Sequence, residues 1–189
     1  MKKSIVSGLA LGALVAAAAS ADPINYLGNL ADGDVGLGRI TLPGDGNGND
    51  NPETWDWWTF FATAGDNITV DVDRLEPNPD MVSATFFGTG ADSNPMTQIA
   101  GGSATPPAGM TWVAGGDDDE DDGFGGPFGD PLYGFVAGST GFYSVVVGNF
   151  LGAGDGDYQI VVTGQTIPAP ASALALLGLG GLTMTRRRR

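Results

Sequence analysis

The clearest pattern in the chain is a two-residue alternation of apolar and polar side chains. Over residues 67–73, isoleucine and valine alternate with threonine and aspartate, and residues 158–162 repeat the pattern. Because successive side chains of a strand point to opposite faces, this predicts strands with one face in a core and one in water. Other short runs, rich in β-branched or aromatic residues and bounded by turn residues, predict six more strands at 38–42, 57–62, 83–87, 110–113, 132–136 and 142–148.

Eight short strands without a sustained helical period predict an all-β fold for residues 22–164. We expect one antiparallel β-sandwich with a jelly-roll-like arrangement. The composition agrees, because 32 glycines and 12 prolines among 189 residues favour turns and disfavour helices. An N-terminal signal helix and a C-terminal hydrophobic helix are expected to flank this domain.

Residues 1–21 have the three parts of a secretory signal peptide. Lys2 and Lys3 form a basic start, residues 5–18 are apolar except for one serine, and Ala19-Ser20-Ala21 is a small-x-small cleavage site. Cleavage is expected before residue 22. The sequence therefore predicts a protein that is exported from the cytoplasm.

The C-terminal residues 165–189 have the arrangement of a sorting tail. Pro168-Ala169-Pro170 precedes a run of small and apolar residues, and four arginines end the chain. Residues 169–184 would form a helix of about 24 Å, a short transmembrane span that arginines on the cytoplasmic side would orient.

This tail resembles the PEP-CTERM tail of Gram-negative bacteria, where the motif is usually Val-Pro-Glu-Pro, although Ala169 takes the place of the Glu. The resemblance implies transient retention in the inner membrane and recognition near Pro168, Ala169 and Pro170 by an exosortase-type transpeptidase. Release to the cell surface or the extracellular matrix would follow. The alternative is an ordinary C-terminal membrane anchor.

The middle of the chain resembles a second known module. An aromatic strand at 56–60 leads through Gly-Asp into the alternating strand at 64–72, and two strands with Gly-x-Tyr openings follow at 141–147 and 156–162. This order is similar to the bacterial pre-peptidase C-terminal (PPC) domain. The resemblance implies a β-sandwich that accompanies secreted or surface proteins and is not itself catalytic.

The residue composition excludes several classes of function. The chain has no His and no Cys, and its lysines lie only at positions 2 and 3, so Ser-His-Asp, Cys-His and Schiff-base chemistries are absent. Between residues 4 and 185 there are 22 acidic residues and two arginines, which gives 2 − 22 = −20. Such a charge excludes nucleic-acid binding. Among so many carboxylates a glycosidase-like pair would occur by accident, and we expect no enzyme.

The densest charge is a run of six adjacent acids whose members are Asp117, Asp118, Asp119, Glu120, Asp121 and Asp122. Two interpretations remain open. The run is either a solvated loop that keeps the protein soluble, or a site at which Ca²⁺ takes several carboxylate oxygens. Ca²⁺ is the only cofactor that the sequence suggests.

Tryptophans suggest a different kind of site. If Trp58 faces the core, then Trp57 points to the opposite face of its strand, and Trp55 precedes it. Exposed indoles at Trp55 and Trp57 would form a platform for sugar rings, whereas buried ones would fill a core.

Together these features predict a non-catalytic exported protein of the cell surface or extracellular matrix. Its acidic β-sandwich would be presented to exopolysaccharide or other matrix polymers after sorting by an exosortase-type enzyme. The alternative is a carbohydrate-binding module that uses the tryptophans near residues 55–58.

Overall fold

The computed structural model describes the central domain of the chain. Its described residues are 23–41, 55–93, 96, 99, 106–120, 124, 129–150 and 154–166. The expected signal peptide, residues 167–189 of the expected sorting tail and both expected terminal helices lie outside these residues.

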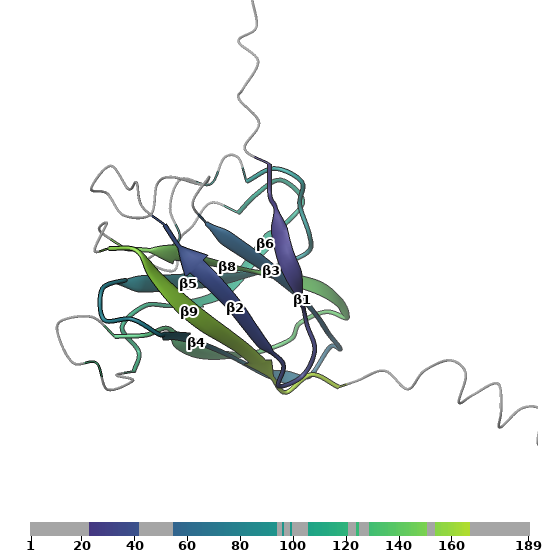
Figure 1. The fold of residues 1–189 in the computed structure, drawn as a ribbon. Coiled ribbons are helices and arrows are strands. Elements are labelled where there is room, and N and C mark those ends of the chain that lie inside the picture. Colours follow the sequence, from purple (N-terminus) through teal and green to yellow (C-terminus); the bar gives the residue numbers. More distant parts are fainter. Residues whose placement is uncertain are drawn as a thin grey trace, which may run out of the picture.

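The described residues form two β-sheets that pack face to face (Figure 1). The five-stranded sheet has, in spatial order, β1 (Tyr26–Leu30), β3 (Asp56–Ala62), β8 (Gly141–Asn149), β5 (Met81–Phe87) and β6 (Thr111–Gly116). The four-stranded sheet has β2 (Val35–Ile40), β9 (Gly156–Thr163), β4 (Asn67–Arg74) and β7 (Leu132–Val136). The predicted all-β sandwich is confirmed.

The strands pair in a nested order. β2 pairs with β9, β3 with β8, β4 with β7 and β5 with β6, all antiparallel. The chain from β2 to β9 is thus a long two-stranded ribbon, folded so that its successive pairs alternate between the two sheets. This is the nested pairing of a jelly roll.

The expectation of a purely antiparallel sandwich is wrong at one edge, where β1 runs parallel to β3. The chain leaves β1 through a turn in which Asp34 N donates to Ala31 O, passes through β2 in the other sheet, and returns as β3. Two changes of sheet restore the original direction, as the crossover between parallel strands requires. β1 was also not predicted as a strand, because Gly28 and Asn29 interrupt its apolar pattern.

One hydrophobic core fills the space between the sheets. It contains alternate residues of the facing strands, among them Trp58 and Phe60 of β3, Val70 of β4 and Ile160 of β9. Burial in β4 alternates as predicted, with Ile68, Val70 and Val72 inside and Thr69, Asp71 and Asp73 on the outer face.

Two tyrosine hydroxyl groups join the sheets inside this core. Tyr133 of β7 shares hydrogen bonds with Ser83 Oγ at 3.0 Å and Thr85 Oγ1 at 2.9 Å, both from β5. Tyr158 of β9 accepts a hydrogen bond from Trp58 Nε1 of β3 at 2.9 Å. These bonds satisfy polar groups that would otherwise be costly to bury.

A second core covers the outer face of the five-stranded sheet. Its buried members are Trp55, Trp57, Val82, Ala84, Phe86, Met96, Ile99, Met110 and Val146. Because both faces are covered, β5 and β8 are buried along nearly their whole length and do not alternate. The outer face of the four-stranded sheet carries the polar side chains of Thr69, Asp71 and Asp73 together with exposed apolar ones such as Leu37 and Val136.

Candidate functional site

The structure excludes the expected tryptophan platform. The side chain of Trp57 is 1% exposed and that of Trp55 is 6% exposed. Alternation along β3 does place Trp57 opposite Trp58, as predicted, but Met96, Ile99 and Met110 belong to the cluster that covers that face. Trp57 packs with its ring 6.1 Å from that of Phe86 and 6.3 Å from that of Tyr26. No indole face is left for a sugar at these two positions.

The described part of the acidic run, residues 117–120, forms a turn directly after β6. Asp119 N and Glu120 N both donate to Asp130 O, and Asp130 N donates to Glu120 O at 2.7 Å. Two of the carboxylates also accept hydrogen bonds from backbone amides. Asp117 N donates to Asp119 Oδ2, and Gly129 N donates to Asp118 Oδ1 at 2.6 Å. The segment 117–120 is therefore held against the residues that precede β7. Asp121 and Asp122 lie outside the described residues.

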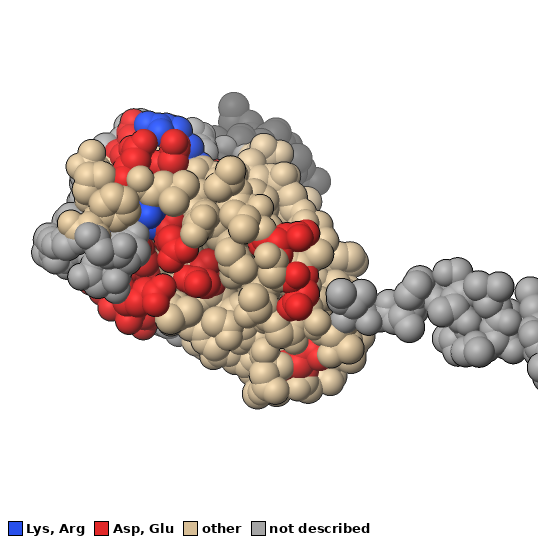
Figure 2. All heavy atoms as spheres, turned by 60° about the horizontal axis from the view of Figure 1, so that its bottom comes forward, with Lys and Arg blue, Asp and Glu red and all other residues tan. Residues whose placement is uncertain are grey.

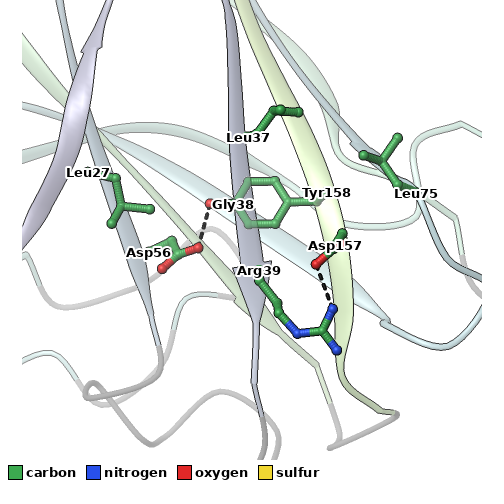
Figure 3. A pocket seen from close by; sticks show the side chains of 8 residues that line it. All are labelled: Leu27, Leu37, Gly38, Arg39, Asp56, Leu75, Asp157 and Tyr158. Carbon is green, nitrogen blue, oxygen red and sulfur yellow. Dashed lines mark hydrogen bonds and ion pairs between the residues drawn. The ribbon is translucent and has the colours of Figure 1, made fainter.

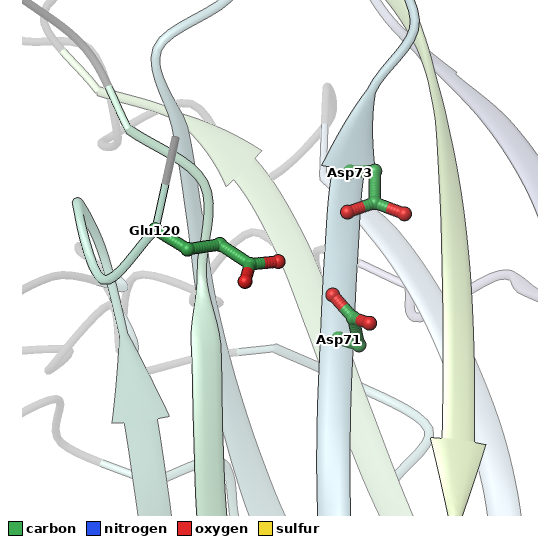
Figure 4. Close-up of side chains that lie close together, drawn as sticks. All are labelled: Asp71, Asp73 and Glu120. Carbon is green, nitrogen blue, oxygen red and sulfur yellow. The ribbon is translucent and has the colours of Figure 1, made fainter. Parts of the chain in front are cut away.

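One carboxylate cluster forms where Glu120 reaches the outer face of β4. Oxygens of Asp71, Asp73 and Glu120 lie within 4.8 Å of one another (Figure 4). Burial, followed by the charges of Asp73 and Glu120, raises the pKa of Asp71 to about 6. Gln159 Nε2 donates to Asp73 Oδ2 at 2.6 Å and orients that carboxylate.

A second carboxylate cluster includes the first two residues of the same segment. It consists of Asp80, Asp117 and Asp118, and one carboxylate oxygen of each lies within 4.8 Å of the other two. Asp80 is only 3% exposed. Burial, followed by the charges of Asp118 and Asp117, raises the pKa of Asp80 to about 7, while Arg74 acts in the opposite direction. Burial also raises the pKa of Asp117.

A buried ion pair lies close to this second cluster. Arg74 Nε is 3.6 Å from Asp130 Oδ1, and both side chains are completely buried. The guanidinium carbon of Arg74 also lies 5.8 Å from the centre of the Phe124 ring. Arg74 points inward because it continues the buried face of β4. Its positive charge stabilises carboxylates that would otherwise be buried without compensation.

A hollow of about 520 Å³ opens on a different part of the surface (Figure 3). It is lined by Leu27, Leu37, Gly38, Arg39, Asp56, Leu75, Asp157 and Tyr158. Tyr158 Oη donates to Asp56 Oδ2 at 2.8 Å, and Arg39 Nη1 lies 2.6 Å from Asp157 Oδ1. Burial raises the pKa of Asp56 and, more strongly, that of Tyr158.

The hollow combines paired polar groups with exposed apolar side chains. Its two lining carboxylates each have a partner, Tyr158 for Asp56 and Arg39 for Asp157. The side chains of Leu27, Leu37 and Leu75 are 46%, 67% and 45% exposed. Tyr158, whose hydroxyl group donates to Asp56, is completely buried, and burial raises its pKa, which disfavours the phenolate form.

Sequence reasoning identified the 117–120 segment as a candidate site but missed its partners. Asp71 and Asp73 were interpreted only as the wet face of a strand, and Asp80 was not singled out. Two aspartates at i and i+2 on one strand do share a face, which was an available signal. Asp80 lies between Pro79 and the apolar strand β5, and this local sequence gives no signal that the residue belongs to a site.

The sequence matches no family model and no curated protein. The fold does resemble solved structures. CorA, a surface-associated copper-binding protein of Methylomicrobium album BG8, matches with a TM-score of 0.50 and 14% identity, over 76% of this chain and 98% of CorA. The two proteins share a fold.

Two further structures match less closely. The pre-peptidase C-terminal domain of collagenase from Bacillus anthracis has 16% identity and a TM-score of 0.44, over 74% of this chain and 97% of that domain. PliG of Aeromonas hydrophila, a periplasmic inhibitor of g-type lysozyme, has 14% identity and a TM-score of 0.42, over 73% and 96%. Neither the PPC resemblance nor the PEP-CTERM resemblance has a family match.

Within the described residues, no helix has the length and apolar character needed to cross a bilayer. The expected transmembrane residues 169–184 lie outside that part of the chain.

Proposed function

We propose that this protein is a non-catalytic exported protein whose acidic β-sandwich is delivered to the cell surface or extracellular matrix. Residues 1–21 act as a signal peptide. Residues 165–189 act as a sorting tail that holds the chain in the inner membrane until an exosortase-type enzyme cleaves near Pro168–Pro170.

The proposal rests chiefly on the position of the strands relative to the two expected cleavage sites. All nine described strands lie between Tyr26 and Thr163. Removal of residues 1–21 and of the chain beyond Pro168 therefore leaves both sheets complete. The last described residue, Thr166, is bound to the domain through Asp66.

The surface supports a role in contact with solvated polymers. Figure 2 shows acidic side chains in several groups on the face it presents, whereas basic side chains appear only at one end. Such a field keeps a protein soluble and repels other anionic surfaces. Neutral or cationic segments of exopolysaccharide or other matrix polymers are the partners that this charge and the leucine-rimmed hollow suit best.

The test is the intact mass of the protein from its native source, measured in the cytosolic, membrane and extracellular fractions. We expect an extracellular form that begins at Asp22 and ends near Pro168. A strain without the exosortase-type enzyme should retain a form with residues 165–189 in the membrane fraction.

Replacement of Arg186–Arg189 by serine gives a matched control, since it alters the tail and leaves the expected signal peptide unchanged. This variant should still lose residues 1–21 but be sorted poorly. A full-length chain that stays in the cytosol would refute the proposal.

A further inference from the structure

Asp80 occupies an unusual position for a carboxylate. Its backbone is fixed at the start of β5, because Asp80 N donates to Asn149 Oδ1 at 3.0 Å and Phe150 N donates to Asp80 O at 2.6 Å. Its side chain is 3% exposed and lies against the turn that follows β6. The fold therefore places a charged group in a largely dry position, which is costly without compensation.

Two oxygens in this cluster have no hydrogen-bond partner among the described residues. Asp80 Oδ1 and Asp117 Oδ1 are both buried and accept no hydrogen bond from any described residue. Buried polar atoms are nearly always satisfied, so two adjacent exceptions need an explanation. Asp118 is more exposed, and Gly129 N fixes its Oδ1 at 2.6 Å.

The spacing of the three carboxylates suits one ion. Ca²⁺ binds oxygens at 2.3–2.6 Å, so two ligands on opposite sides of the ion are separated by about 4.8 Å. Oxygens of Asp80, Asp117 and Asp118 all lie within 4.8 Å of one another. They therefore fit into one coordination sphere, with further positions left for water or backbone oxygens.

Positive charge is scarce in the part of the chain that the structure describes. Arg39 and Arg74 are the only basic residues between positions 4 and 185. Arg39 pairs with Asp157 and Glu76, and Arg74 lies 3.6 Å from the buried carboxylate of Asp130. Arg74 lowers the pKa of Asp80, but the three carboxylates of the cluster outnumber this one guanidinium group.

We propose that Asp80, Asp117 and Asp118 bind a hard divalent cation of the Ca²⁺ type. Their donor atoms are all oxygens, which favour hard cations over thiophilic metals. The bound ion ties the turn after β6 to the start of β5. This site is independent of the route by which the protein is exported, and each proposal can fail without the other.

The test is equilibrium dialysis of the full chain against Ca²⁺ at constant ionic strength. We expect one saturable site per chain that is lost on Asp80→Asn or Asp118→Asn, with a dissociation constant in the range of about 10⁻⁴ to 10⁻³ M, typical of extracellular calcium modules. Each variant should weaken binding by about tenfold or more. Because Asp118 is exposed, its variant keeps the test valid if Asp80→Asn does not fold, which circular dichroism would show.

Asp34→Asn is the matched control, since it removes one exposed charge from the β1–β2 turn and belongs to neither cluster. It should bind Ca²⁺ as the unmodified chain does. Binding by Asp80→Asn and Asp118→Asn within twofold of the control would overturn the proposal. So would an equal rise in melting temperature with CaCl₂ and with NaCl at matched ionic strength, because screening alone would then explain the effect.

Discussion

Gly38 lies directly opposite Tyr158 in the β2–β9 ladder, and the tyrosine ring occupies the space that a side chain at residue 38 would need. The ring can therefore turn across β2, where its hydroxyl group donates to Asp56 Oδ2 and accepts from Trp58 Nε1. The absence of a side chain in one strand thus allows a polar link between the two sheets.

Gly38→Ala is expected to destabilise the domain. A methyl group there would collide with the Tyr158 ring and either strain β2 or displace the hydroxyl group from Asp56. Overpacking of this kind costs about 1–3 kcal/mol. Urea unfolding measures the change.

Gly134→Ala serves as the control for this prediction. A methyl group at residue 134 meets only the carbonyl oxygen of Ile68, at 3.4 Å. This variant should unfold at nearly the same urea concentration as the unmodified protein. Equal losses at positions 38 and 134 would show that the tyrosine contact is not the cause.

Trp57→Ala is expected to act on stability and not on sugar binding. The indole is buried against Phe86 and Tyr26, and its removal leaves a large cavity in the second core. Loss of a buried aromatic side chain costs about 3–5 kcal/mol. Leu37→Ala, at a side chain that is 67% exposed, should change the free energy of unfolding by less than about 0.5 kcal/mol. A Trp57→Ala protein as stable as the Leu37→Ala protein would contradict this assignment.

The raised pKa of Asp71 leads to a prediction about how the stability of the protein depends on pH in metal-free buffer. Its pKa is about 6 in the folded protein, above the ordinary 3.8, so the folded state holds this proton over a range in which the unfolded chain has released it. The contribution of Asp71 to the free energy of unfolding therefore increases as the pH falls from 7.5 through 6, and is complete near pH 4.

Asp71→Asn removes the charge and nearly preserves the shape. At pH 7.5 the variant should be more stable by about 1 kcal/mol, less than the full value of the pKa shift because solvent screens the partly exposed cluster. The advantage should vanish near pH 4. Chemical denaturation in EDTA at several pH values provides the measurement, and a gap that did not change with pH would rule out this explanation.

Asp66 should behave in the opposite way. Hydrogen bonds from the Thr166 hydroxyl group, Thr166 N and Thr63 N lower the pKa of Asp66, so its charged form is favoured in the folded state. Its contribution to stability is present above the ordinary value of 3.8 and is lost as the pH falls through the lowered pKa.

Asp66→Ala should therefore be less stable than the unmodified protein at pH 7, and the difference should narrow in acid. Thr166→Val removes the hydroxyl donor on the other side of the same contact. In a double-mutant cycle, the double variant should lose less free energy of unfolding than the sum of the losses of the two single variants. Strict additivity would mean that the two side chains do not interact.

Predictions from the sequence succeeded where the pattern was local. Alternation in β4 and β9 identified the strands and their inner faces, because the two-residue period follows from backbone geometry alone. Alternation in β3 also placed Trp57 and Trp58 on opposite faces of their strand, and the structure confirms this. β1 was missed because Gly28 and Asn29 have little strand preference of their own, and pairing with β3 is what makes that segment a strand.

The exposure of Trp57 and the partners of the acidic run depend on segments far apart in the chain. The sequence near residue 57 does not indicate that Met96, Ile99 and Met110 will cover the sheet face on which Trp57 lies. Likewise, the acidic run beginning at Asp117 indicates a high charge density, but it does not indicate which residues will lie beside it. The packing of β4, β5 and the turn after β6 brings Asp80 to Asp117 and Asp118.

By itself, the sequence determined the all-β class, the inner faces of the alternating strands and the large negative charge, since these follow from backbone geometry and from the residues present. The tertiary structure decided which faces are covered and which carboxylates meet. Burial and proximity are properties of the packed sheets, and long-range packing has no local pattern from which it can be inferred.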